Sequence, residues 1–260
     1  MLVKDPVAIS LNPYVGRLVT VDVTIGDDTL KFLLDTGGGK TFLVPDTARR
    51  LWCNPSGRSV SFRMNGEIVE SQSCYDLSLS IGGIAFHPNE LGVWDVNSVL
   101  PSDLPKLDGI LSLDTLHNQP FTLDLASKQL VLESPESLSN RTREMTKLES
   151  RLATGLDGRE LTVFLHGKIK AFGWFLLDNG NLEATIVSPH LAVETERDAA
   201  ESSSTWEAEF TLKNAIPIST RFRTKNIIYD GALSEEFMRK WVFTFDLMNN
   251  SVWALPLESD

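Results

Sequence analysis

The stretch KFLLDTGGGKTFLVP at residues 31–45 decides the fold, because the second half of the chain repeats it as WFLLDNGNLEATIVSP at residues 174–189. Phe32-Leu33-Leu34-Asp35 in the first block corresponds to Phe175-Leu176-Leu177-Asp178 in the second. The glycine two residues after each aspartate is also shared, as Gly37 and Gly180. One such block could be a coincidence between two β segments, so a second correspondence is needed to establish a repeat.

A second pair of blocks supplies it. DGILSLDTLHNQPFTLDL (108–125) aligns without gaps to DGALSEEFMRKWVFTFDL (230–247). Both pairs occur in the same order, which indicates two copies of one folding unit. The first pair is offset by 143 residues and the second by 122, so the second copy is 21 residues shorter between its blocks. The extra length of the first copy predicts a hairpin with its tip near Asn65-Gly66, a strong two-residue turn signal.

Around these blocks the chain reads as short β-strands that alternate or run apolar and end in Gly, Asp or Asn turns. Short helices are expected at 46–52 and 234–240, and a helical stretch around 138–152. A polar, charged segment separates two β-rich blocks and indicates a boundary between lobes. We therefore divide the chain into an N-terminal lobe with the hairpin (1–134), an interlobe linker (135–158) and a C-terminal lobe (159–260).

Composition excludes several classes of protein. The 260 residues include 35 acidic and 24 basic ones, for a net charge of -11, and no basic cluster is visible, so we expect no nucleic-acid partner. No apolar run is long enough to span a membrane, so no membrane association is expected. The four histidines have no ligand spacing, and we predict neither a metal site nor a cofactor.

The two cysteines and the N-terminus leave alternatives open. Cys53 and Cys74 could form one bridge or remain two buried thiols, and we favour reduced thiols. The first residues show no signal peptide. As given, the chain would be cytoplasmic, or it is an exported protein whose signal segment was trimmed.

Each copy places one aspartate after a buried apolar strand and before a glycine, which indicates a carboxylate in a tight loop at a strand end. If the copies pack about a pseudo-twofold axis, Asp35 and Asp178 face each other. Two adjacent carboxylates cannot both ionise freely, so the pair holds one proton. Such a pair suits hydrolysis, because the ionised partner can activate a water while the protonated partner hydrogen-bonds the scissile carbonyl.

The motif Asp35-Thr36-Gly37 after FLL, followed by FLVP and later by DGILSLD, resembles the aspartic protease pattern of pepsin-like and retropepsin-like enzymes. The resemblance covers roughly 15–133 and 160–256 and implies an all-β, two-lobed acid-protease fold with pseudo-twofold symmetry and a few short helices. It implies an aspartic endopeptidase that acts as a monomer on a peptide or unfolded protein. By motif position the resemblance assigns catalysis to Asp35 and Asp178. It assigns the bracing and the tight turns of the Asp loops to Thr36, Gly37, Asn179 and Gly180, and support behind those loops to Gly109 and Gly231. It assigns a substrate-binding flap to Arg63, Met64, Asn65 and Gly66.

The sequence also departs from that pattern. The second motif is Asp-Asn-Gly, where the family usually has Thr or Ser, and Asn is bulkier. Pepsin-like enzymes often place a hydroxyl directly after each motif glycine and work at low pH; Gly38 and Asn181 stand there, so we expect a milder pH preference. The flap lacks the pepsin tyrosine, since Tyr75 falls on the returning strand, and Ala232 should pack less well behind the second loop.

These departures keep rival interpretations open. The main one is a catalytically inactive peptide-binding protein of the same fold, and a more distant one is an unrelated β-sandwich. Trp174, just before the second Asp loop, is a candidate cleft residue. The acidic stretch 193–204 is expected to be a solvated loop, in the place where a second flap-like hairpin would lie.

Overall fold

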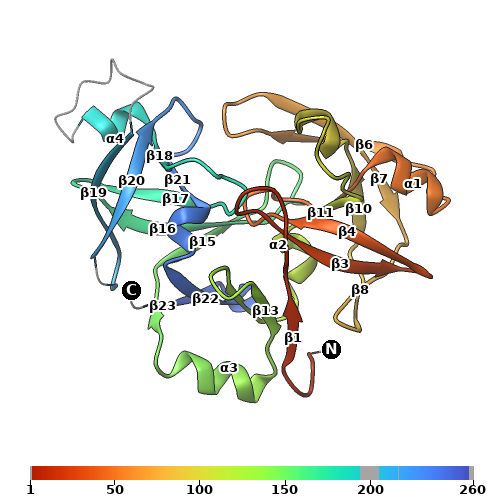
Figure 1. Cartoon of the computed structure of the whole chain (residues 1–260), viewed down its shortest axis with the longest axis horizontal. Coiled ribbons are helices and arrows are strands. Elements are labelled where there is room, and N and C mark those ends of the chain that lie inside the picture. The colour runs from red at the N-terminus through yellow and green to blue at the C-terminus, as the bar shows by residue number, and fades with distance from the viewer. Residues whose placement is uncertain (1, 194–204, 216, 258–260) are drawn as a thin grey trace.

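The structure is a computed structural model, and it describes residues 2–193, 205–215 and 217–257. Three β-sheets account for most of the described chain (Figure 1). One belongs to an N-terminal lobe, one to a C-terminal lobe, and the third lies beneath both (Figure 1). The expected 193–204 loop lies outside the described residues, apart from Val193 at the end of a helix.

The N-terminal lobe contains a ten-stranded sheet. Its longest strands alternate between polar and apolar residues, so that one face is buried, as in the VTVDVTI run of β3. The strands are β2 (Asn12–Pro13), β3 (Val19–Ile25), β4 (Asp28–Leu34), β5 (Phe42–Leu43), β6 (Ser56–Phe62), β7 (Ile68–Tyr75), β8 (Leu79–Ile81), β9 (Ile84–Phe86), β10 (Glu90–Val93) and β11 (Gly109–Leu111). β6 and β7 form the hairpin expected from the Asn65-Gly66 signal.

The C-terminal lobe contains a seven-stranded sheet that curls until β16 pairs with β19. This pairing leaves β15 as the strand outside the closed ring. The strands are β15 (Ser150–Ala153), β16 (Thr162–Lys168), β17 (Phe172–Leu177), β18 (Thr185–Val187), β19 (Thr205–Leu212), β20 (Pro217–Thr224) and β21 (Gly231–Leu233).

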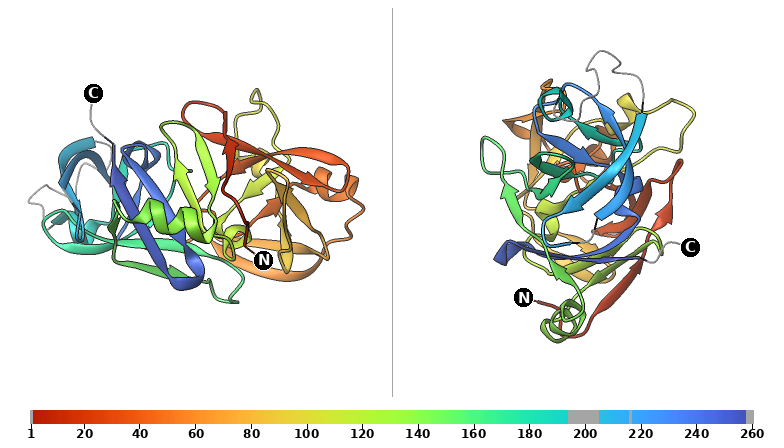
Figure 2. Two further views of the ribbon diagram at one scale, coloured as in Figure 1. Left: turned by 90° about the horizontal axis from the view of Figure 1, so that it is seen from below. Right: turned by 90° about the vertical axis from the view of Figure 1, so that its left-hand side faces the viewer.

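The third sheet joins the two halves of the chain. Its six strands follow the order β1 (Val7–Ser10), β13 (Gln129–Leu132), β12 (Phe121–Asp124), β22 (Trp241–Asp246), β23 (Ser251–Pro256) and β14 (Thr146–Lys147). β12 pairs with β22 so that Thr122 lies opposite Thr244, and their hydroxyl oxygens are 2.8 Å apart. These two threonines are repeat equivalents, so the pseudo-twofold axis passes between them. The views in Figure 2 show this sheet running under both lobes.

The helices are short. They are α1 (Pro45–Arg50), α2 (Leu113–Leu116), α3 (Pro135–Thr142), α4 (Pro189–Val193), α5 (Glu235–Met238) and the 3-10 helices η1 (Val96–Val99) and η2 (Leu247–Asn249). α1 and α5 lie where the sequence predicts them.

The helix expected around 138–152 is wrong in extent. α3 begins earlier, at Pro135, because Ser134 and Ser137 form a reciprocal capping box. It ends at Thr142, and the following residues form β14 and β15 instead. Pairing with β23 and β16 therefore outweighs the local helical pattern of this polar segment.

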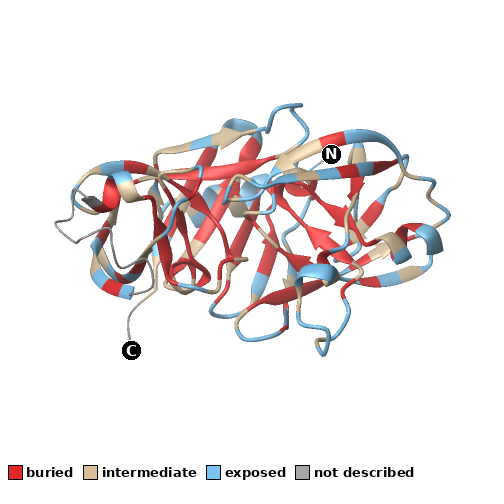
Figure 3. Ribbon diagram, turned by 90° about the horizontal axis from the view of Figure 1, so that it is seen from above, coloured by how far each residue is buried: buried red, intermediate tan, exposed pale blue. Residues whose placement is uncertain are grey.

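Buried residues, coloured red in Figure 3, extend from one lobe to the other through the interlobe sheet. Phe121 and Phe245 stack at the centre of that sheet with ring centroids 4.6 Å apart. The two lobes therefore share one core, which holds their facing loops in a fixed relation. Among the described residues, none of the helices has the length and apolar character needed to cross a membrane.

The expectation of two reduced thiols is wrong, because Cys53 and Cys74 form a disulfide. Cys53 follows α1 and Cys74 lies in β7, with their Cα atoms 5.8 Å apart. That distance is typical of bridged cysteines. The sequence could not reveal it, since it arises only when α1 folds back against the hairpin strand.

Candidate active site

The two Asp loops occupy equivalent places in the two lobes. Asp35 follows β4 and Asp178 follows β17, and each preceding strand is paired in parallel with a short strand, β11 or β21. The backbone N–H of Asp35 donates to the carbonyl of Leu111 at 3.0 Å, and that of Asp178 donates to Leu233 at 3.2 Å. Each aspartate is thus fixed by the second repeated block of its own lobe, which explains why both blocks recur together.

Gly109 and Gly231 allow this close support. A Cβ atom on Gly109 would lie 2.3 Å from the carbonyl oxygen of Phe42, and one on Gly231 would lie 2.6 Å from that of Ile186. A side chain at either position would push the supporting strand away from its neighbour. The structure therefore places these two glycines behind the loops, where the sequence predicts them.

A reciprocal set of hydrogen bonds joins the two loops across the pseudo-twofold axis. The Thr36 hydroxyl donates to the carbonyl of Leu177 at 2.8 Å, and the Asn179 amide donates to the carbonyl of Leu34 at 2.9 Å. In addition, the Thr36 N–H donates to the Asn179 side-chain oxygen at 2.7 Å, and the Asn179 N–H donates to the Thr36 hydroxyl at 3.1 Å. Asparagine therefore makes all the contacts of a brace at this position, and both side chains are 1% exposed.

The brace brings the two carboxyl groups to one point. A Cβ atom built on Gly180 would lie 3.0 Å from Oδ1 of Asp35 and 3.1 Å from Oδ1 of Asp178. A Cβ on Gly37 would lie 2.5 Å from Oδ1 of Asp178. Only glycine fits at these two positions, because a side chain would fill the space that the carboxylates share.

Burial and mutual repulsion raise the pKa values of the pair. Burial raises the pKa of Asp35, although backbone N–H groups of its own loop oppose the shift. Burial and then the negative charge of Asp35 raise the pKa of Asp178 to about 8. The two carboxyl groups titrate as a unit, so the raised pKa values mean that the pair shares a proton at neutral pH.

The residues after the motif glycines supply no hydroxyl to the carboxylates. Gly38 has no side chain, and the Asn181 amide turns away, donating to the carbonyl of Ala184 at 3.4 Å and accepting from the N–H of Glu183 at 3.1 Å. Asn181 contacts the dyad only through its backbone N–H, which donates to Asp178 at 3.1 Å.

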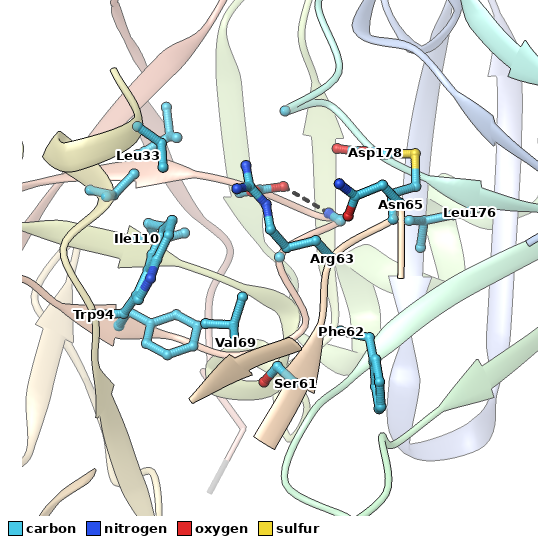
Figure 4. A pocket seen from close by; sticks show the side chains of 18 of the residues that line it. Leu33, Ser61, Phe62, Arg63, Asn65, Val69, Trp94, Ile110, Leu176 and Asp178 are labelled. Atoms are coloured by element: carbon cyan, nitrogen blue, oxygen red, sulfur yellow. Dashed lines mark hydrogen bonds between the residues drawn. The ribbon is translucent and has the colours of Figure 1, made fainter. Parts of the chain in front are cut away.

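A cleft of about 520 Å³ opens over the dyad, and both aspartates line it. Arg63, Met64 and Asn65 line it from the tip of the β6–β7 hairpin, and Figure 4 shows Arg63 and Asn65 among the side chains of the pocket. Gly66 forms the turn at that tip with a φ of 85°. The tip reaches the opposite lobe, since the N–H of Ile228 donates to the carbonyl of Met64 at 3.0 Å.

Two apolar clusters flank the dyad at equivalent positions of the lobes. The N-terminal cluster lines the open cleft; it consists of Leu33, Phe42, Val96, Ile110 and their buried neighbours, with Trp94 packed against them. The C-terminal cluster consists of Phe164, Leu176, Ile186, Ile227 and Ala232. Met64 of the hairpin packs against the second cluster, so the hairpin tip covers the C-terminal side of the cleft.

Several cleft residues lack a sequence motif. Trp94, Lys225 and Tyr229 line the cleft from loops whose position depends on the tertiary structure. Trp174 is not among the lining residues; its ring stacks on His166 with centroids 4.8 Å apart. Ala232 is fully buried within the C-terminal cluster. Within the described part of the chain, no group of three or more potential ligands could hold a metal ion.

Comparisons with known proteins agree with this geometry. Residues 21–115, which include the first Asp loop and the hairpin, match the family model described as aspartyl protease. The structure is similar to that of basic 7S globulin from soybean, with a TM-score of 0.61 and 9% identity over 97% of this chain and 95% of that one. It is also similar to conglutin gamma from lupine seeds, with a TM-score of 0.64 and 12% identity over 98% and 96% of the chains.

These findings define the class. The chain has the two-lobed, mostly β acid-protease fold of the pepsin type, as the sequence predicts. The match of the first lobe supports an aspartic protease family. None of the curated protein sequences matches the chain.

Proposed function

We propose that this protein is an aspartic endopeptidase that hydrolyses peptide bonds with a water held between Asp35 and Asp178. The observation that carries the proposal is the complete brace between Thr36 and Asn179, which holds two buried carboxyl groups around one point. A loop that keeps its aspartate only for structure has no need of this cross-lobe geometry.

In the proposed reaction the two carboxyl groups take complementary roles. Asp35 is the ionised partner and takes a proton from the water as the water attacks the scissile carbonyl carbon. Asp178, whose pKa is raised to about 8, is the protonated partner and donates a hydrogen bond to the carbonyl oxygen. Asp35, now protonated, then passes its proton to the leaving amine, which completes cleavage without a covalent intermediate.

The substrate is an extended peptide from an unfolded protein, bound by strand pairing with the 60–72 hairpin. The apolar cluster beside Asp35 provides a pocket for an apolar side chain on one side of the scissile bond. Both lobes of the site come from one chain, so the active form is a monomer. Peptide binding displaces Met64 from the C-terminal cluster, because the hairpin tip covers it.

Cleavage of an unfolded protein across a range of pH tests the proposal. Asp35→Asn and Asp178→Asn should each abolish cleavage, while Asp103→Asn, which changes an exposed loop residue, should leave it unchanged. Full activity in either dyad variant would refute the paired-carboxylate mechanism. A transition-state mimic of aspartic proteases should inhibit the wild-type chain.

A second candidate function is peptide binding without cleavage. It is favoured by the two similar solved structures, basic 7S globulin from soybean and conglutin gamma from lupine seeds, whose names describe globulins and not peptidases. Saturable binding of an extended peptide by wild-type protein, with no cleavage product at any pH, would select this function instead.

A further inference from the structure

Ser112 stands out in the second repeated block because its hydroxyl is buried without a partner. The side chain is 0% exposed, and within the described part of the chain no group exchanges a hydrogen bond with its Oγ. Leaving a buried hydroxyl unpaired costs about 1–3 kcal/mol. Such a group in a folded protein calls for an explanation.

The repeat offers an internal comparison. Ser112 corresponds to Ser234 in the ungapped alignment, and the two have the same backbone role: each N–H donates to a threonine hydroxyl, that of Thr41 or that of Thr185. Their side chains differ. The Ser234 hydroxyl caps α5 by accepting from the N–H of Phe237 at 3.3 Å, whereas Ser112 makes no capping bond to α2. The Ser112 hydroxyl is therefore free for another partner.

The space next to Gly38 indicates that a carboxylate oxygen of Asp35 is the candidate partner for the Ser112 hydroxyl. A Cβ atom built on Gly38 would lie 2.7 Å from Oγ of Ser112 and 3.2 Å from Oδ2 of Asp35. Both oxygens thus border the same point, at which a side chain of residue 38 would begin. A serine carries its hydroxyl on a single rotatable bond, so rotation about that bond redirects the donor with little change elsewhere.

We propose that Ser112 is a positioning residue of the dyad: its hydroxyl donates a hydrogen bond to Oδ2 of Asp35 and stabilises the ionised form of that carboxylate. This inference rests on the proposed function and adds a residue to it. Gly38 contributes to the same arrangement, because a Cβ atom there would lie 2.7 Å from the Ser112 hydroxyl oxygen and would compete with it for the space beside Asp35. The donor reaches Asp35 from the supporting block behind the loop rather than from the loop itself.

A donor to the ionised carboxylate lowers its pKa, so removal of the Ser112 hydroxyl should raise the lower of the two pKa values of the dyad. A charge-assisted hydrogen bond corresponds to a shift of about one pKa unit. A substitution at position 112 leaves the other ionisable groups near the dyad in place. The groups that pack against the Asp loops or line the cleft are Arg63, Asp114, Asp178, Lys225 and Tyr229.

The test is a titration of the aspartate carboxyl groups by ¹³C NMR in the full chain, assigned with Asp35→Asn and Asp178→Asn. Ser112→Ala should raise the lower dyad pKa by about one unit. Ser234→Ala is the matched control; it removes the equivalent hydroxyl from the other lobe and should leave the dyad unchanged. In the double variant Gly38→Ser with Ser112→Gly, the hydroxyl moves to the Asp loop and the pKa should return toward its wild-type value.

The titration does not depend on turnover, so it separates this inference from the proposed function. An unmoved lower pKa in Ser112→Ala, or an equal shift in Ser234→Ala, would overturn the role of Ser112 even in an active protease. A shift confined to Ser112→Ala would support the role even if the wild-type chain cleaved no peptide. In an active enzyme, the acidic limb of kcat/KM should move to higher pH in the same variant.

Discussion

Replacing Asp178 by asparagine should remove most of the pH dependence of stability between pH 6 and pH 8. Burial and the charge of Asp35 raise the pKa of Asp178 from 3.8 to about 8. The folded chain therefore keeps a proton that the unfolded chain has released. This contribution to stability is fully present below pH 3.8 and is lost as the pH rises through about 8.

The folded chain holds one more proton than the unfolded chain in this pH range, and this difference sets the change in the free energy of unfolding. Across the window the free energy of unfolding falls by about 1.4 kcal/mol per pH unit, and the slope flattens near pH 8, so the total loss from pH 6 to pH 8 is about 2 kcal/mol. Asp114, whose pKa burial raises to about 6, contributes mainly below this window. An asparagine at position 178 has no proton to release and keeps an oxygen to accept from the N–H of Asn181.

The assay is urea unfolding of the wild-type chain and Asp178→Asn at pH 6, 7 and 8, with Asp103→Asn as an exposed control. The wild type and the control should lose about 2 kcal/mol over this range, and Asp178→Asn should lose much less. The reasoning is refuted if the wild-type free energy of unfolding is flat or rises with pH, or if Asp178→Asn keeps the wild-type slope.

Three further predictions concern the brace, the disulfide and the hairpin. Asn179→Ala should lower the free energy of unfolding by about 3 kcal/mol, because backbone groups of the opposite loop lose their buried hydrogen-bond partners. Asn179→Thr should recover part of this loss. Equal urea midpoints for the two variants would contradict the prediction. Joint replacement of Cys53 and Cys74 by serine should cost about 3 kcal/mol in thermal unfolding, and an unchanged Tm would argue against the bridge. Ile228→Pro removes the N–H that donates to the carbonyl of Met64, so amide hydrogen exchange at the hairpin tip should become about tenfold faster. Ile228→Ala keeps this N–H and serves as the control. Equal exchange rates in the two variants would show that this hydrogen bond does not hold the tip.

The sequence by itself determined the repeat, and with it the fold and the candidate dyad. Two blocks recurring in one order could be recognised because each carries a local constraint: an apolar strand, an aspartate and glycines where no side chain fits. The hairpin tip followed from the Asn65-Gly66 turn, and α5 from the capping serine Ser234. α1 lies close to the expected 46–52, although it begins at Pro45 without a side-chain cap. These features depend on residues close in the chain, so pattern alone could place them.

Only the tertiary structure decided how distant residues meet. It showed that Asn179 completes the brace, because that depends on the distance between two loops 143 residues apart. It paired Cys53 with Cys74, and it placed β14 and β15 in the second half of the helical stretch expected around 138–152, because the partners of these strands lie elsewhere in the chain. It also left the Ser112 hydroxyl buried without a partner, while the equivalent hydroxyl of Ser234 caps a helix. Side-chain direction is set by packing between lobes, which no local pattern encodes.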